Sequence, residues 1–201
     1  MPYETKEWDD RYRQPGYWAG TEPAEFLREV MPLLPRGAVL DMASGEGRNA
    51  VFLARHGYQV SAVERSRAGL EKTEALARES GVGSCWATRL TPAHRPGAPL
   101  LLVQADLESF ALPAEQFDVV LCFKYLQRPL LPFLPRALRR RGMLVYETHT
   151  LEQLKFPGGP RSAEFLLRPG ELREAFSAME VLFYSEICAG KGTASLLARK
   201  A

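Results

Sequence analysis

The residues best suited to chemistry begin with an aspartate at the end of an apolar run and two glycines that follow it. They stand in the order Asp41-Met42-Ala43-Ser44-Gly45-Glu46-Gly47. Glycine at 45 and 47 removes the side chains that would keep a ligand away from the backbone. The free N–H groups at the start of a following helix would favour a carboxylate or another anionic group. This stretch therefore predicts a nucleotide-binding loop.

Two further acids follow the next two predicted strands. Glu64 ends the second strand, and Asp106 follows the third in Gln104-Ala105-Asp106-Leu107. Ligands of open α/β sheets bind beyond the carboxyl ends of the strands, so the three acids should meet at one edge. Glu64 could accept both ribose hydroxyls and Asp106 the adenine amino group, with Leu107 packing on the ring. The pattern predicts a nucleoside site.

The kind of nucleotide depends on Asp41. Gly45-x-Gly47-x-x-Ala50 also fits the dinucleotide fingerprint, and Glu64 stands at a suitable distance for a ribose contact, so an NAD(P) oxidoreductase is an alternative. A carboxylate beside the turn would repel a pyrophosphate. S-adenosylmethionine has no phosphate and carries an ammonium and a sulfonium, which suit nearby carboxylates. Asp41 therefore favours S-adenosylmethionine.

Alternating strands and helices position these residues. The spacing of apolar residues and turn signals predicts seven strands, at 38–43, 59–64, 100–105, 117–123, 143–148, 180–187 and 194–200. It predicts helices at 23–34, 48–56, 66–80, 129–140 and 169–178. Such alternation implies a parallel sheet covered on both faces. The four residues between the last two strands require antiparallel pairing, because a parallel crossover needs a dozen or more.

Bulk composition sets limits on partners and location. The chain has 201 residues, is 46% hydrophobic and 25% charged, and carries a net charge of +2, which suits one domain over 1–201 and argues against nucleic-acid or membrane partners. Cys85, Cys122 and Cys188 form no CxxC pair, so neither a disulfide framework nor a metal site is expected. No signal peptide or membrane-spanning run is apparent, which favours the cytoplasm, and we expect a monomer or weak homodimer.

Taken together, these residues closely resemble the class I S-adenosylmethionine-dependent methyltransferases, especially the small bacterial group related to tellurite-resistance and thiopurine-type enzymes. The resemblance spans nearly the whole chain. Its first motif is similar to Leu40–Ala50, its entry segment to Gly20–Leu27 and its later motifs to Tyr125–Leu130, Leu144–Thr148 and Phe165–Leu172. The group usually has Cys where Ser44 stands and Asp at position 64. The 83–99 stretch, rich in proline and glycine, is longer than the family norm and is expected to be a surface loop.

The resemblance implies a Rossmann-like, doubly wound α/β fold with a seven-stranded, mostly parallel sheet and a C-terminal antiparallel hairpin. It implies S-adenosyl-L-methionine as cofactor and no metal. The expected cofactor-binding residues are Trp18, Asp41, Ala43, Gly45, Gly47, Asn49, Glu64, Arg65, Asp106, Leu107 and Phe123.

Candidates for the methyl-acceptor side come from the ends of the fourth and fifth strands. Tyr125 and Arg128 follow the fourth strand, and Glu147 and His149 end the fifth. Tyr125, Arg128 and His149 are the expected catalytic residues: Arg128 could hold an anionic acceptor, and His149 could act as a base. Structural contacts and packing are the alternatives for each.

The first 23 residues are rich in aromatic side chains, including Trp8, Tyr12, Tyr17 and Trp18. We expect them to form a lid over cofactor and acceptor, although packing onto the domain is the alternative. The resulting prediction is a methyltransferase for a small molecule, such as a thiol, a metalloid oxyanion or another small anion. A module that binds S-adenosylmethionine without catalysis remains a second possibility, and an RNA or protein methyltransferase is disfavoured because no motif for flipped bases is present.

Overall fold

The computed structural model describes residues 5–90 and 97–201, with side chains described from Glu7 onward. The chain forms two compact units, and each is described by itself. The first unit comprises the chain up to Met31 together with Arg36–Ala111, and the second comprises Pro32–Pro35 with Leu112–Ala201. No helix in the described ranges is long and apolar enough to cross a membrane.

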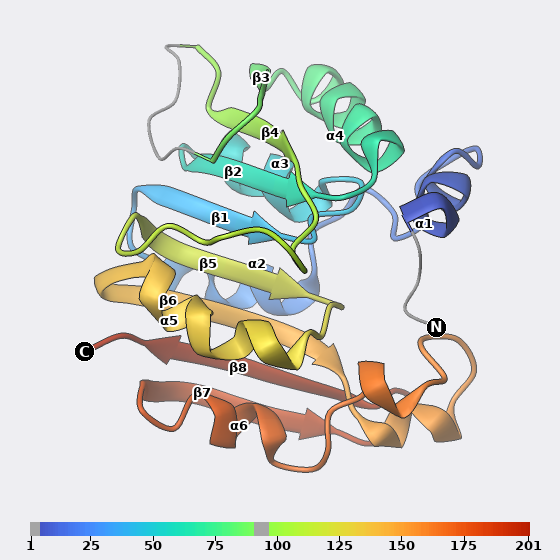
Figure 1. The fold of residues 1–201 in the computed structure, drawn as a ribbon, viewed down its shortest axis with the longest axis vertical. Helices are drawn as coiled ribbons and strands as arrows, with labels where there is room; N and C mark the ends of the chain where they lie inside the picture. Colours follow the sequence, from blue (N-terminus) through green and yellow to red (C-terminus); the bar gives the residue numbers. More distant parts are fainter. Residues whose placement is uncertain (1–4, 91–96) are drawn as a thin grey trace. The chain divides into compact units, whose positions relative to one another are not determined.

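The first unit is built on four parallel strands. They are β1 (Ala38–Met42), β2 (Gln59–Glu64), β3 (Ser84–Ala87) and β4 (Leu100–Gln104), and they pair in the order β3-β4-β2-β1. In register, Asp41 lies opposite Ala62 and Glu64 lies opposite Gln104. The parallel pairing places the carboxyl ends of β1, β2 and β4 at one edge of the strands (Figure 1).

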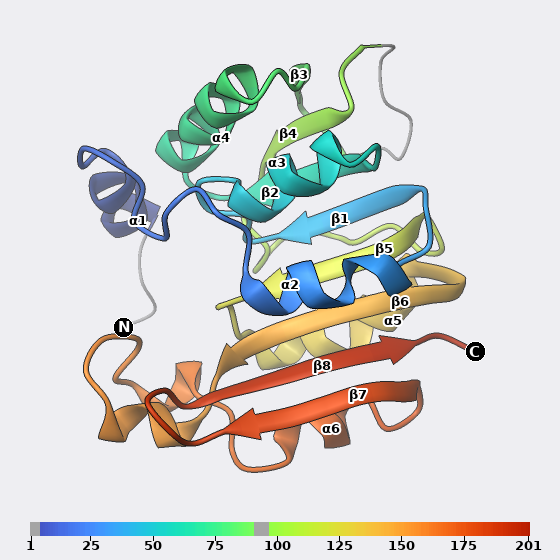
Figure 2. The same ribbon diagram turned by 180° about the vertical axis from the view of Figure 1, so that it is seen from behind.

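Helices α1 (Thr5–Tyr12), α2 (Glu25–Val30), α3 (Arg48–Arg55) and α4 (Arg67–Glu79) complete this unit, and η1 (Met31–Leu33) continues α2. Helix α3 covers the face of β2 that Figure 2 turns toward the viewer. Gly57, with φ +83°, closes α3 through the bonds Gly57 N–H to Ala54 O and Tyr58 N–H to Leu53 O. Ser66 caps α4 by accepting from the Gly69 N–H. Both helices lie within the predicted ranges 48–56 and 66–80.

The second unit contains β5 (Phe117–Phe123), β6 (Leu138–His149), β7 (Glu180–Ile187) and β8 (Thr193–Arg199), in the order β5-β6-β8-β7. β5 and β6 are parallel, whereas β6–β8 and β8–β7 are antiparallel. The predicted reversed hairpin at the C-terminal end is therefore confirmed. Short helical segments join the strands: η2 (Arg128–Phe133), α5 (Leu134–Ala137), η3 (Leu151–Lys155), η4 (Ala163–Phe165) and α6 (Glu171–Ala175).

Each unit has its own apolar core. Fully buried side chains of the first unit include Leu27, Leu40, Leu53, Leu70 and Leu102. Those of the second include Phe117, Leu121, Tyr146 and Phe176. Burial of a side chain of this size contributes about 1.5–3 kcal/mol relative to exposure, so these residues supply much of the stabilisation.

The predicted helix over 129–140 is wrong in type and length. Residues 128–133 form a 3₁₀ helix and 134–137 a single α-helical turn, while 138–142 belong to β6. Prolines at 129, 132 and 135 lack the N–H that a continuous α-helix needs, which accounts for the broken geometry. The basic run Arg139–Arg141 therefore lies in a strand and does not form a helix end.

The other differences concern the lengths of elements, and one α-helix and one strand that were not predicted. The predicted helices 23–34 and 169–178 shorten to α2 and α6, and α1 was not predicted. The predicted loop over 83–99 contains β3, which pairs with β4. The described residues therefore form eight strands, whereas seven were expected. Residues 91–96 of that loop lie outside the described residues.

Replacing Phe117 with Ala should destabilise the protein by about 3–5 kcal/mol, because the ring is fully buried and its removal leaves a cavity. Phe133, in the same unit, has 47% of its surface exposed, so Phe133→Ala is a matched control that should cost far less. Urea unfolding followed by circular dichroism measures both. Equal effects of the two substitutions would contradict this core assignment.

Candidate functional site

Glu64 holds together the two turns that flank the end of β2. Its Oε2 accepts from the Gly45 N–H at 3.0 Å, and its Oε1 accepts from the Ser66 N–H at 2.9 Å. Ser66 in turn caps α4, so one carboxylate fixes both the glycine loop and the start of that helix. The Arg65 N–H also bonds to this carboxylate. A carboxylate has about four lone-pair sites, so about one is left to accept a ribose hydroxyl.

The glycine loop between β1 and α3 needs an unusual backbone. Gly45 and Gly47 have φ values of +57° and +82°, and a Cβ on Gly47 would lie 2.2 Å from Thr73 Cγ2. Ala43, a predicted cofactor residue, also adopts a positive φ of 50°, which costs energy in a residue with a Cβ. The turn closes through the bond from the Gly47 N–H to the Ser44 carbonyl, at 3.0 Å. The two glycines and Ala43 thus form a tight turn directly after β1.

Asp41 is a buried acid with an unused acceptor. Only 2% of its surface is exposed, and no described group hydrogen bonds to its Oδ2. Burial raises the pKa of Asp41 to about 7; Arg48 and the Ala50 N–H lower it, while Glu64 raises it further. A buried unpaired oxygen is costly unless a ligand or another group satisfies it. Asp41 is therefore suited to meet a donor or a cation.

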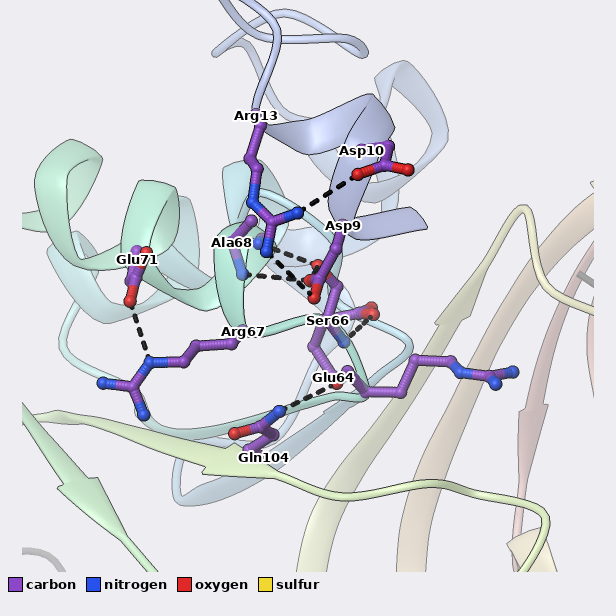
Figure 3. A network of polar contacts seen from close by, with 11 residues as sticks. Asp9, Asp10, Arg13, Glu64, Ser66, Arg67, Ala68, Glu71 and Gln104 are labelled. Atoms are coloured by element: carbon purple, nitrogen blue, oxygen red, sulfur yellow. Dashed lines mark hydrogen bonds and ion pairs between the residues drawn. The ribbon is translucent and has the colours of Figure 1, made fainter. Parts of the chain in front are cut away.

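Helix α1 lies against the start of α4, as Figure 3 shows. Asp9 accepts from the Ser66 hydroxyl and from the Ala68 N–H, the latter at 3.3 Å. Tyr12 is buried, and its hydroxyl lies 3.0 Å from the position of a Cβ on Gly45. Burial and the Glu64 and Glu46 carboxylates raise the pKa of Tyr12, so its hydroxyl stays protonated beside the loop. Sequence reasoning placed Tyr12 in an N-terminal lid but did not assign Asp9 to the site.

The segment after α1 is tied to the same loop through Glu46. Glu46 Oε2 accepts from the Trp18 N–H at 2.6 Å, and its Oε1 lies 2.7 Å from Lys72 Nζ. The Trp18 ring is 67% exposed and stacks on Arg11, so the predicted cofactor residue Trp18 approaches the loop through its backbone. Lys72 also donates to the Gln14 carbonyl at 2.8 Å, which fixes the segment on α4.

The remaining predicted cofactor residues of this unit take two kinds of position. Asn49 accepts from the Ala24 N–H at 2.9 Å and so anchors the chain ahead of α2. The Arg65 guanidinium lies 3.9 Å from Asp106 Oδ2. Leu107, the residue after Asp106, is buried. The Asp106 side chain is 41% exposed, which leaves it accessible to a ligand. Asp41, Glu64 and Asp106 are thus all at the carboxyl ends of neighbouring strands, as expected.

The candidates for acceptor chemistry lie in the second unit. Arg128 pairs with Glu171 at 2.6 Å and donates to the carbonyls of Glu164 and Leu166, so most of its donors are committed to structural contacts. The hydrogen bond to Glu171 raises the pKa of Arg128. The Tyr125 hydroxyl donates to Gln127 Oε1 at 2.7 Å, an intra-loop contact. Phe123 ends β5 and is largely buried.

His149 and Glu147 lie together at the end of β6. Glu147 pairs with Lys124 at 2.9 Å and accepts from the Ser195 hydroxyl at 2.9 Å. Burial alone would raise the pKa of Glu147, but Lys124 and Ser195 together lower it. Burial and the nearby Lys124 lower the pKa of His149, so its ring is neutral at physiological pH. Within the described residues, no group of His, Cys, Asp and Glu side chains could hold a metal.

A family described as a methyltransferase domain matches residues 40–146, which begin in β1 and end in β6. No curated protein is significantly similar to the chain in sequence.

Solved structures show the same fold at low sequence identity. A protein studied for the conversion of a disulfide bond into a thioacetal group during echinomycin biosynthesis has a TM-score of 0.70 and 19% identity, over 98% of this chain and 92% of that one. TehB from Haemophilus influenzae has a TM-score of 0.67 and 16% identity, over 98% and 67%. An S-adenosylmethionine-dependent methyltransferase from Aquifex aeolicus has a TM-score of 0.67 and 15% identity, over 99% and 100%. The class I methyltransferase fold is therefore confirmed.

The family implies S-adenosylmethionine as the cofactor, and the residues of the first unit fit it. Asp41 Oδ2 is buried and unpaired, which suits a cationic group. A Cβ at Gly47 would collide with Thr73, so glycine lets the loop pack closely against α4. Glu64 and Asp106 provide acceptors for hydroxyl and amino groups. Nothing in this set favours a pyrophosphate, and the NAD(P) alternative is not supported.

Replacing Gly47 with Ala should abolish detectable cofactor binding, because the new Cβ meets Thr73 and the backbone has φ +82°. Gly81→Ala is the matched control, since Gly81 has a similar φ of +69° but open space around it. Isothermal titration calorimetry with S-adenosylmethionine on both variants, with circular dichroism for folding, makes the comparison. Wild-type affinity in folded Gly47→Ala protein would show that the loop is not the binding site.

The affinity for the cofactor should fall as the pH drops below about 7, the pKa of Asp41, because protonation removes the charge that attracts a cation. Well below this pKa, the affinity should fall about tenfold for each pH unit, because one proton is involved. The unliganded protein should show the opposite trend. Asp41 binds its proton more tightly when folded than when unfolded, so the free energy of unfolding decreases as the pH rises from the unfolded pKa of 3.8 to about 7.

Titration calorimetry between pH 5.5 and 8 and urea unfolding over the same range measure these two trends. Asp41→Asn should flatten both, whereas Asp118→Asn, at a partly exposed surface pair with Arg139, should leave both unchanged. A pH-independent affinity in the wild-type protein would refute the role of Asp41.

Proposed function

Since the chain belongs to the methyltransferase domain family, we propose that it transfers the methyl group of S-adenosylmethionine to a small molecule. The acceptor classes we favour are a thiol, a metalloid oxyanion or another small anion. The observation that carries the cofactor half of this proposal is the unpaired, buried oxygen of Asp41 beside the glycine loop. The sequence motifs further favour the group related to tellurite-resistance and thiopurine-type enzymes.

A small acceptor is supported by the charge and by the side chains at the ends of β5 and β6. The net charge of +2 gives no electrostatic reason to expect nucleic acid as a partner. The cation Lys124 and the neutral His149 stand near Glu147, a combination that suits a compact polar ligand. Cys85, Cys122 and Cys188 form no disulfide in the described residues, which accords with a reducing location. We therefore propose a cytoplasmic monomer or weak homodimer without nucleic-acid or membrane partners.

The chemistry of such an enzyme requires little from the protein beyond positioning. The bound cofactor supplies a methyl group that is already activated by a positive sulfur. Asp41, Glu64 and Asp106 would orient its charged and hydrogen-bonding groups. Tyr12 and the segment held by Glu46 and Lys72 would exclude water from the loop, the role expected of an N-terminal lid.

A module that binds S-adenosylmethionine without transferring its methyl group is the second candidate. One of the similar structures, at a TM-score of 0.64 and 18% identity, is the [4+2]-cyclase SpnF, so this fold also occurs in an enzyme named for a different reaction. The commitment of Arg128 to Glu171 and two carbonyls also removes one expected acceptor ligand unless these contacts break.

Turnover assays distinguish the two candidates. We expect the protein to release S-adenosylhomocysteine when it is supplied with S-adenosylmethionine and at least one member of a panel of thiols, tellurite, selenite and small organic acids. Gly47→Ala should lose this activity, because it should not bind the cofactor. Tight cofactor binding without turnover on any acceptor in the panel would favour the non-catalytic module.

A further inference from the structure

Four polar side chains share one face of the β6–β8 ladder at its end. Glu147 and His149 are two residues apart on β6 and so point to the same side. Ser195 and Thr193 are their register partners on β8. Lys124 joins them from the residue after β5, with Nζ 2.9 Å from Glu147 Oε1. We call these five residues the β6–β8 polar cluster.

The cluster is polar where the same face of the ladder is otherwise apolar. The preceding pair on this face is Val145 with Leu197, and both are buried. Glu147, Thr193 and Ser195 are also at least nine-tenths buried. Burying a carboxylate and two hydroxyls costs free energy that an apolar continuation would not, so the cluster is poorly explained by stability alone.

Two atoms of the cluster lack partners, and one residue is strained. Thr193 is 1% exposed, and no described group hydrogen bonds to its Oγ1. His149, its partner across the ladder, has a buried Nδ1 that is likewise unsatisfied. Lys124 adopts a φ of +56°, which is uncommon for a residue with a side chain and is found preferentially at functional sites. Two unsatisfied buried atoms and a strained backbone thus occur together at the end of the β6–β8 ladder.

The charges of the cluster select the kind of ligand. Lys124 and Glu147 form an ion pair, and Lys191 adds a second cation close enough to act on Glu147. With two cations, one carboxylate and a neutral imidazole, the surroundings carry an excess positive charge. An acceptor with one anionic group would balance it. A neutral imidazole without a partner on Nδ1 can accept a proton, which matters for a hydroxyl or amine nucleophile and not for a thiolate.

We propose that the β6–β8 polar cluster is the acceptor site. Its ligand would be a small organic acid whose anionic group pairs with Lys124 and whose hydroxyl or amino group gives its proton to His149. This inference rests on the proposed function and narrows its acceptor class. The acceptor's oxygen or nitrogen forms a bond to the methyl carbon while the carbon–sulfur bond breaks and its electron pair stays on sulfur. The proton released by the acceptor passes to His149 and then to solvent.

Binding to the full-length protein provides the first test. With S-adenosylhomocysteine present, ¹⁵N spectra of labelled histidine rings follow His149, assigned with a His149→Gln variant. The probes are 4-hydroxybenzoate, 3-hydroxybenzoate, anthranilate and lactate, with 4-hydroxybenzamide as the uncharged match. We expect at least one acid to shift the His149 resonances saturably and the amide to leave them in place. No saturable shift by any acid, or an equal shift by the amide, would overturn the proposal.

Variants identify the cation. Lys124→Met should weaken binding of the acid at least tenfold, and Lys124→Arg, which keeps the charge, should restore most of it. Lys155→Met is the matched control, because Lys155 is an exposed lysine of the same unit that pairs only with Glu152 among the described contacts. Unchanged binding in Lys124→Met would overturn the proposal. Binding of S-adenosylhomocysteine is measured on the same samples as a separate test of the proposed function. A protein that does not bind S-adenosylhomocysteine would contradict the proposed function itself.

The pH dependence of turnover identifies the base. The assay uses an acid that binds and keeps S-adenosylmethionine saturating at every pH, so that protonation of Asp41 does not limit the rate. Methylation should then decline as the pH falls through the pKa of His149, which burial and Lys124 lower while the Gly192 carbonyl, Gln153 and Glu147 raise it. His149→Gln should remove this limb and slow turnover without changing cofactor affinity. His56→Gln, at an exposed histidine of the other unit, should preserve both. A pH profile that survives in His149→Gln would exclude His149 as the base.

Discussion

The candidate cofactor site depends on one carboxylate that accepts from two turns. Glu64 ends β2 and receives N–H groups from Gly45 in the β1–α3 loop and from Ser66 at the start of α4. Through Ser66 the same contact extends to Asp9 on α1 (Figure 3). Charge-assisted hydrogen bonds to backbone are stronger than neutral ones, so they can hold the glycine loop in its positive-φ conformation. The acid predicted to bind ribose is thus also the residue that shapes the loop.

Much of the first unit could be predicted from the sequence because its determinants are local. The apolar runs of β1 and β2, the cap at Ser66 and the glycine after α3 each act within a few residues. Parallel pairing then brings the ends of successive strands to one edge, so Asp41, Glu64 and Asp106 could be grouped before the fold was known. In both units, strands that are marked by local apolar patterns have the expected boundaries, as in β2, β5 and β7.

The features that could not be predicted depend on contacts distant in sequence. Asp9 reaches Ser66 only because α1 packs against α4, a contact between segments more than fifty residues apart. Arg128 was expected to hold an anion, but a glutamate 43 positions later occupies it. The strand β3 has four residues in a proline-rich and glycine-rich region, and it forms because β4 offers a free neighbouring edge. No local pattern encodes any of these three contacts.

The two units place opposite charges at the carboxyl ends of their strands. In the first unit, Asp41 and Glu64 are buried acids, and burial raises the pKa of both. Burying these charged carboxylates costs free energy in the unliganded protein, and a cationic ligand would offset that cost. In the second unit, Lys124 keeps Glu147 ionised, and the local excess of charge is positive. A sulfonium donor suits the first environment and an anionic acceptor suits the second. Under the proposed function, the charge of each unit would favour one partner of the transfer reaction.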